Sequence, residues 1–140
     1  MHLLDVNVWL SLAFDSHEHH PPARSWFLAR EVESCCFCRV TQQGFLRLAT
    51  TPRVLSRQAL SQREAWQAYD AICGDPRVVY ADEPEGIEPL WRRHTQRDTY
   101  SPRVWTDAYL AAFAQAADLE LVTFDRGLAE TRGPRCTLLT

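Results

Sequence analysis

Three aspartates stand at the ends of apolar segments, where their carboxylates could bind a cation together. Asp5 directly follows a short apolar run at the start of the chain, and Asp125 follows a second apolar run over residues 121–124. Asp107 lies early in an alanine-rich segment with helical spacing. A buried carboxylate is costly unless a metal or an arginine pairs with it. If the two apolar runs are neighbouring parallel strands, their carboxyl ends face one crevice, and the three acids predict a divalent-cation site there.

The elements that must position these acids alternate along the chain. Strand-like runs at residues 1–5, 35–40, 78–80, 121–124 and 136–139 are separated by segments with helical spacing, which predicts an α/β fold with a mostly parallel sheet. Thr41 is expected to cap a helix over residues 42–49. Ser61 and Glu64 form the pattern of a capping box at the start of a helix that ends before Gly74.

Length and composition fit one soluble globular domain spanning residues 1–140, since 46% of the residues are hydrophobic and 24% are charged. No apolar run approaches the ~20 residues of a membrane span, and no basic signal-peptide region is present, so we expect a cytoplasmic protein. The five cysteines are an odd number without disulfide-like spacing and are expected to be free thiols.

The overall charge argues against a general nucleic-acid binder, because the net charge is −3 and the pI is about 5.9. All fifteen basic residues are arginine, which binds phosphate better than lysine, although genome composition can produce the same bias. An acid after the first strand also occurs in flavodoxin-like and phosphotransfer domains. Those domains are disfavoured because none of the five glycines clusters after a strand.

Four segments, in this order and spacing, carry a resemblance to a known family. They are residues 3–7 (LLDVN), 39–48 (RVTQQGFLRL), 106–112 (TDAYLAA) and 121–126 (LVTFDR). The chain resembles the PIN-domain nucleases and, within them, the VapC-type toxins of bacterial type II toxin–antitoxin systems. The resemblance implies a three-layer α/β/α sandwich with strand order 3-2-1-4-5. It also implies Mg²⁺- or Mn²⁺-dependent cleavage of RNA, homodimerisation, and inhibition by a cognate antitoxin.

The resemblance also suggests roles for the acids. Asp5 and Asp107 would bind the metal directly, and Asp125 would act through a metal-bound water or complete a second metal site. The reaction would be hydrolysis of a phosphodiester bond. Asn7 and Thr123 would orient ligands or water. The alternatives are that Asp5 and Asp125 are helix N-caps and that Asp107 is a solvated acid in a first helical turn.

One departure from the family concerns Gln42, because many PIN nucleases are expected to carry a glutamate there. A glutamine can coordinate through its carbonyl oxygen but brings no charge, so Gln42, counted with the catalytic group, favours a single ion. It also suggests the alternative that this protein is a catalytically weakened PIN-fold binding module. The enzyme is the leading hypothesis, because Asp5, Asp107 and Asp125 are all present.

Three surfaces complete the predictions. A phosphate-guiding rim for RNA is expected from Arg92, Arg93, Arg97 and Arg103, which lead into the segment bearing Asp107, although arginines that merely cover a helix end would look the same. The histidine-rich residues 17–20 are interpreted as a solvated loop. A homodimer interface is expected at the following apolar residues: Phe45, Leu48, Trp66 and Tyr69.

Overall fold

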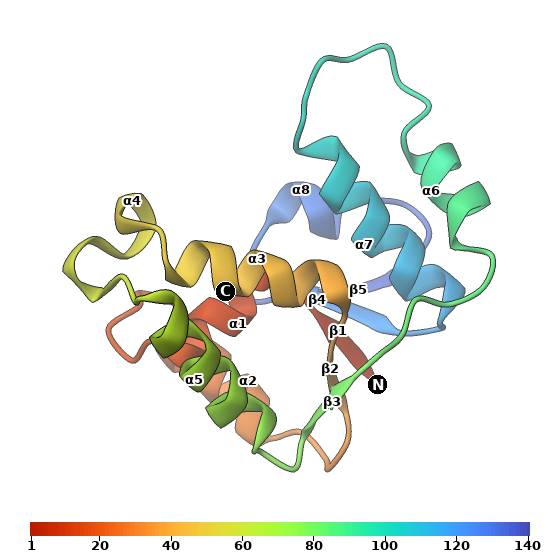
Figure 1. Cartoon of the computed structure of the whole chain (residues 1–140). Helices are drawn as coiled ribbons and strands as arrows, with labels where there is room; N and C mark the ends of the chain where they lie inside the picture. The colour runs from red at the N-terminus through yellow and green to blue at the C-terminus, as the bar shows by residue number, and fades with distance from the viewer.

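A five-stranded sheet forms the centre of the protein in the computed structural model, which describes residues 1–140 (Figure 1). The strands are β1 (His2–Leu4), β2 (Cys35–Phe37), β3 (Val78–Tyr80), β4 (Glu120–Thr123) and β5 (Arg135–Leu138). All four pairings are parallel, and the order is β3-β2-β1-β4-β5. The predicted order is therefore confirmed, and β1 and β4 lie side by side as the acidic strand ends require.

Helices connect the strands and cover both faces of the sheet. They are α1 (Val6–Ala13), α2 (His20–Leu28), α3 (Arg39–Ala49), α4 (Pro52–Leu55), α5 (Gln62–Cys73), α6 (Ile87–His94), α7 (Val104–Ala116) and α8 (Arg126–Ala129). A 3-10 turn, η1 (Ser56–Gln58), follows α4. The capping box of Ser61 and Glu64 at α5 is confirmed. The predicted cap at Thr41 is wrong: α3 begins one turn earlier, and Cys38 is its N-cap residue while the Thr41 hydroxyl accepts from the Cys38 N–H.

Two apolar cores make the α/β/α sandwich, because successive side chains of a strand point to opposite faces. Leu4 of β1 packs into a core with α1, α2, α3 and α5. Leu3 packs into a second core with α6, α7 and α8. In Figure 1, α7 lies above the sheet and α6 at its upper right, whereas α1, α2 and α5 lie to its left. The predicted three-layer architecture is confirmed.

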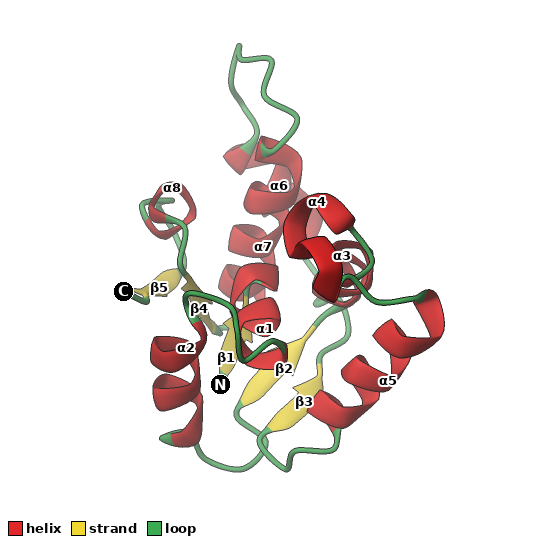
Figure 2. Ribbon diagram, turned by 90° about the vertical axis from the view of Figure 1, so that its left-hand side faces the viewer, coloured by secondary structure: helices red, strands yellow, loops and turns green.

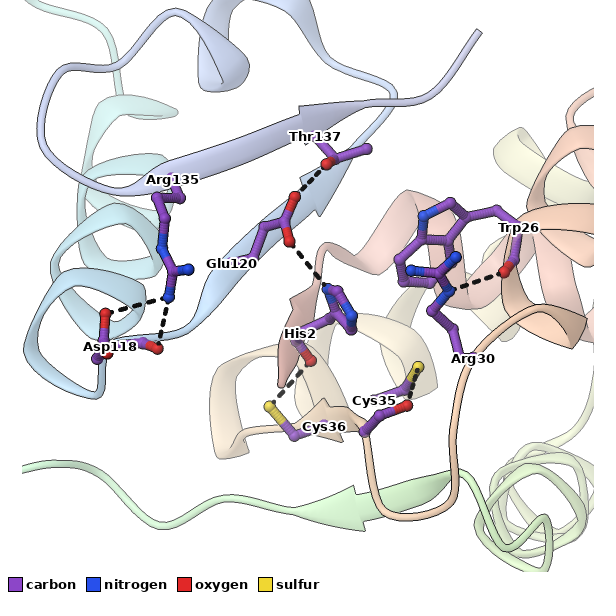
Figure 3. Close-up of polar contacts among 10 residues, drawn as sticks. His2, Trp26, Arg30, Cys35, Cys36, Asp118, Glu120, Arg135 and Thr137 are labelled. Atoms are coloured by element: carbon purple, nitrogen blue, oxygen red, sulfur yellow. Dashed lines mark hydrogen bonds and ion pairs between the residues drawn. The ribbon is translucent and has the colours of Figure 1, made fainter.

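Polar contacts link β1, β4 and β5 near the first residues of β1 and β4 (Figure 3). Glu120 on β4 pairs with His2 on β1 at 3.4 Å and accepts a hydrogen bond from Thr137 on β5. Arg135 donates to the Asp118 carboxylate at 3.1 Å. These contacts fix β5, the outer strand, at the end of the sheet that carries no candidate site.

All five cysteines are free thiols, as expected. Burial raises the pKa of the Cys36 thiol to about 12. Two of the residues expected at the dimer interface, Phe45 and Tyr69, are instead buried in the first core. Trp66, on the outer side of α5, is 49% exposed. None of the helices is long and apolar enough to cross a membrane.

Two segments extend from the body of the molecule at the end where the strands finish. The loop at residues 95–103, between α6 and α7, projects furthest in both views (Figures 1 and 2). The short helix α4 and the turn η1 project at the end of α3. The region between these projections is where the acidic strand ends emerge.

Candidate metal centre

A cleft of about 690 Å³ opens at the carboxyl ends of β1 and β4, lined by residues of α3 and of the first turns of α1 and α7. It is lined by Asp5, Val6, Asn7, Val40, Gln43, Gly44, Arg47, Leu48, Arg103, Thr106, Asp107 and Asp125. The three predicted acids therefore line one cleft, although Asp107 and Asp125 lie 102 and 120 positions after Asp5 in the sequence. Asn7, predicted as a supporting residue, also lines it.

Asp5 is the most buried of the three acids, with 9% of its surface exposed. One carboxylate oxygen accepts from the Val6 N–H at 2.7 Å, so Asp5 is also the N-cap of α1. The other oxygen accepts from the Thr123 hydroxyl at 2.8 Å. Burial raises the pKa of Asp5 to about 6 even though both hydrogen bonds act to lower it. The capping alternative and the metal-site hypothesis are thus compatible at this residue.

Asp107 lies in the first turn of α7 and is half-buried. Burial raises its pKa, and the nearby Asp125 carboxylate raises it further, whereas the Arg103 guanidinium lowers it. The carboxylates of Asp107 and Asp125 also contribute to the raised pKa of Asp5. The three carboxylates therefore repel one another in the cleft, and Arg103 offsets this repulsion only in part.

Asp125 is more exposed and caps the last short helix, α8. Its Oδ1 accepts from the N–H groups of Gly127 and Leu128, at 2.7 and 3.2 Å. Its Oδ2 makes no protein hydrogen bond and is free to accept from water or bind a cation. The backbone N–H of Asp125 donates to the Thr123 hydroxyl oxygen at 2.9 Å. Thr123 is thus bonded to both acids and fixes Asp125 relative to Asp5.

The donor set suits a hard divalent cation such as Mg²⁺, which prefers oxygen ligands and commonly takes one or two carboxylates with water and substrate phosphate. No three acids, histidines or cysteines lie close enough to bind one ion simultaneously in this arrangement. An ion bound directly by two of the carboxylates, with the third acting through water, is consistent with both the ligand preference of Mg²⁺ and this spacing. Repulsion among the three acids is a second observation in favour of a cation, because a positive ion would relieve it.

Gln42 does not belong to this cleft, contrary to the prediction. It is 8% exposed, and its side-chain oxygen accepts from the Arg39 guanidinium. The glutamine of α3 that lines the cleft is instead Gln43. The residues of α3 in the cleft follow helical spacing: Val40, Gln43, Gly44, Arg47 and Leu48. That periodicity was available in the sequence, and position 42 falls outside it.

Gly44 allows α3 to pass close to the start of α1, where Asp5 is held. A Cβ atom at this position would lie 2.6 Å from a methyl group of Val6, which is closer than real contacts allow. Any larger residue would push α3 away from the acid-bearing end of β1. The glycine therefore sets the width of the cleft.

The predicted RNA-binding arginines are divided among several environments. Arg103 lines the cleft, and Arg97 lies in the projecting loop beside it. Arg92 is ion-paired with Glu88 at 2.8 Å on exposed helix surface. Arg93 lines a shallow hollow next to α8, together with Arg97. Sequence reasoning missed Arg47, which reaches the cleft from the opposite wall.

The histidine-rich segment is more ordered than a solvated loop. His17 and His19 are half-buried, and the His19 backbone N–H donates to His17 Nδ1 at 3.1 Å. The His19 ring stacks on Phe124, with ring centroids 4.4 Å apart. These two histidines line a small hollow together with Asn7 and Asp125, which also line the cleft, and they form no metal cluster.

Comparisons with known proteins agree with this fold. The PIN domain family model matches residues 2–134. Ribonuclease VapC41 of Mycobacterium tuberculosis is 44% identical over 144 aligned positions, covering 99% of each chain. VapBC2 from Rickettsia felis, solved with a promoter DNA fragment, superposes with a TM-score of 0.69 at 9% identity, covering 99% of this chain and 98% of that one. A toxin–antitoxin complex from Klebsiella pneumoniae has a TM-score of 0.61 at 18% identity, covering 98% and 96%.

Proposed function

The chain belongs to the PIN-domain family and, within it, to the VapC ribonucleases, and on that premise we propose that it is a metal-dependent endoribonuclease toxin. The observation that carries the proposal is the meeting of Asp5, Asp107 and Asp125 in one cleft. The reaction is hydrolysis of an RNA phosphodiester bond. The cation is Mg²⁺, with Mn²⁺ as a substitute, because all the site's donors are oxygens.

Asp5 and Asp107 would hold the cation, and Asp125 would act through water with its free Oδ2. When bound, the cation lowers the pKa of a coordinated water and offsets charge on the phosphate. Thr123 keeps the Asp5 carboxylate in one orientation, since the hydroxyl and the Val6 N–H each bind one of its oxygens. Asn7 lies beside them in the cleft wall and orients water or the sugar–phosphate backbone.

Two arginines offset the acidic character of the cleft. Arg47 approaches from α3 and Arg103 from the start of α7, so one guanidinium stands on each wall. Arginine donates two parallel N–H groups to a phosphate. We therefore assign the positioning of the RNA backbone to Arg47 and Arg103, with Arg97 and Arg93 extending the basic path. Arg92 contributes less, because Glu88 already pairs with it.

Partners follow from the same family. The protein is proposed to be a homodimer and to be silenced by a cognate antitoxin encoded beside it. The support is its fold, which superposes on the toxin–antitoxin complex from Klebsiella pneumoniae. The revised dimer surface includes the exposed Trp66 but not the buried Phe45 and Tyr69.

A cleavage assay separates this function from the alternative of a weakened binding module. Purified protein is incubated with total RNA in Mg²⁺ or Mn²⁺, and the products are mapped by their new ends. We expect cleavage that chelation stops and that Asp107→Asn abolishes. Asp70→Asn, which alters an exposed acid on α5, is the matched control and should retain cleavage. RNA binding without cleavage in either metal would favour the binding module.

A further inference from the structure

A second hollow of about 310 Å³ adjoins the candidate metal centre on the α7 side. It is lined by Thr95, Arg97, Thr99, Tyr100, Ser101, Pro102, Val104 and Trp105. The start of α7 forms the wall between the two cavities, since Val104 and Trp105 line the second hollow whereas Thr106 and Asp107 line the cleft. A ligand in the hollow therefore lies across this wall from the acids, and an extended ligand reaches both cavities by passing around the start of α7.

Trp105 is 59% exposed although it is a large apolar side chain, and Tyr100 is fully exposed. The position of Trp105 is nevertheless fixed by Trp91. The indole N–H of Trp91 donates to the Trp105 carbonyl at 3.0 Å, and the two rings meet edge to face with centroids 6.3 Å apart. Trp91 in turn meets the buried Tyr109 ring edge to face, with centroids 5.3 Å apart. A chain of aromatic rings thus runs from the second core to an exposed platform.

The chemistry of the hollow indicates what would lie on that platform. Its only charged lining residue is Arg97, and the neighbouring cleft wall carries Arg103. A volume near 310 Å³ is at the lower end of small-molecule pockets, which begin at roughly 300 Å³. A planar, apolar group attached to an anion matches both the rings and the arginines. A nucleotide has this combination.

We propose that an unpaired nucleobase of the RNA substrate stacks on Trp105, with Tyr100 beside it, while the RNA backbone passes around the start of α7, over Arg103, into the metal cleft. This proposal rests on the proposed ribonuclease function and adds a specificity-determining residue to it. Bases in a duplex hide their faces against their neighbours, whereas bases in loops and single strands can be splayed onto aromatic side chains. The platform therefore selects cut sites in unpaired RNA.

Binding is measured in EDTA, where cleavage does not occur, by fluorescence anisotropy of a labelled single-stranded RNA and of its duplex. Trp105→Ala should weaken single-strand binding by roughly 5- to 150-fold, the range for loss of one base–aromatic stack. Trp105→Phe should retain most of the affinity. Duplex binding should not change. Val32→Ala, which trims a similarly exposed apolar side chain in the loop between α2 and β2, is the control and should leave single-strand binding unchanged.

An abasic-site scan tests the contact itself. Removing one base at a time from the single strand should identify a position at which affinity falls in the wild type but not in Trp105→Ala. An unchanged abasic penalty in Trp105→Ala would overturn the proposal, as would equal weakening of single-strand and duplex binding. Dissociation of a dimer by Trp105→Ala with unaltered RNA affinity would instead identify a second copy of the chain as the occupant. Absence of cleavage in Mg²⁺ and Mn²⁺ would refute the ribonuclease function separately, because this binding is measured without metal.

Discussion

The Thr123 hydroxyl donates to the Asp5 carboxylate at 2.8 Å, joining residues 118 positions apart at the ends of two neighbouring strands. Thr123 is fully buried, and its oxygen also accepts from the Asp125 N–H. One short side chain thus orients two of the three acids in the cleft. A buried hydrogen bond to a charged group typically contributes about 1.5–3 kcal/mol, more than a neutral one.

Replacing Thr123 with valine removes this bond while keeping the shape of the side chain. We expect Thr123→Val to weaken divalent-cation binding by roughly tenfold, because an orientation worth about 1.4 kcal/mol is lost. Calorimetric titration with Mn²⁺ measures the effect. Thr50→Val changes a half-buried threonine at the end of α3 and serves as the control. Equal Mn²⁺ affinity in wild type and Thr123→Val would show that Asp5 needs no such support.

Asp107→Asn should abolish cleavage without reducing the thermal stability of the metal-free protein. Burial and the Asp125 carboxylate both raise the pKa of Asp107, so its charge is unfavourable in the apo form. Removing that charge should leave the melting temperature equal or slightly higher, as measured by differential scanning fluorimetry in EDTA. Added Mn²⁺ should raise the melting temperature of the wild type more than that of the variant. A strongly lowered apo melting temperature would mean that Asp107 is structural.

The stability of the metal-free protein should depend on pH through Asp5. Its pKa is raised to about 6 in the folded state, so the folded protein binds this proton more tightly than the unfolded chain does. The associated stabilisation is present at low pH and is lost as pH rises from about 4 to about 6. Burial lowers the pKa of His2 and His17, which opposes this trend as the pH falls.

The comparison with Asp5→Asn isolates the contribution of Asp5. Free energies of unfolding are measured by urea denaturation in EDTA at pH 5 and pH 7.5. Going from pH 5 to pH 7.5, the wild type should lose stability relative to Asp5→Asn, because asparagine has no proton to release. Parallel pH profiles for the two proteins would contradict the raised pKa.

Much of the site could be predicted because its acids are tied to strand ends. Asp5 and Asp125 follow apolar runs directly, so the parallel pairing of β1 and β4 places them together with little dependence on side-chain detail. Asp107 could be placed because it lies in the first turn of a long helix. Thr123 lies at the end of β4, two residues before Asp125, and the pairing of β1 with β4 places its hydroxyl against Asp5.

The wrong predictions concern the rotation of a helix about its own axis, which decides which of its side chains face the cleft or the core. Gln42 and Gln43 are adjacent and chemically identical, and the start of α3 decides which one faces the acids. The same uncertainty made Phe45 and Tyr69 look like surface residues, whereas the rings of Phe37 and Tyr69 pack against each other inside the core with centroids 5.0 Å apart. Side-chain packing between helices far apart in sequence is not encoded in local spacing.

Gln43, rather than Gln42, is the position at which an added charge should act on the cation. Gln43→Glu adds a fourth carboxylate to the cleft wall, and we expect it to tighten Mn²⁺ binding by about fivefold, or about 1 kcal/mol, after desolvation and repulsion from the other acids are subtracted. Gln42→Glu introduces the same charge one residue away, beside the Arg39 guanidinium and outside the cleft, and should leave Mn²⁺ affinity unchanged. Calorimetric titration of both variants compares the two positions directly. A larger gain for Gln42→Glu would mean that α3 is rotated in the metal-bound protein, and the assignment of the cleft wall would then have to change.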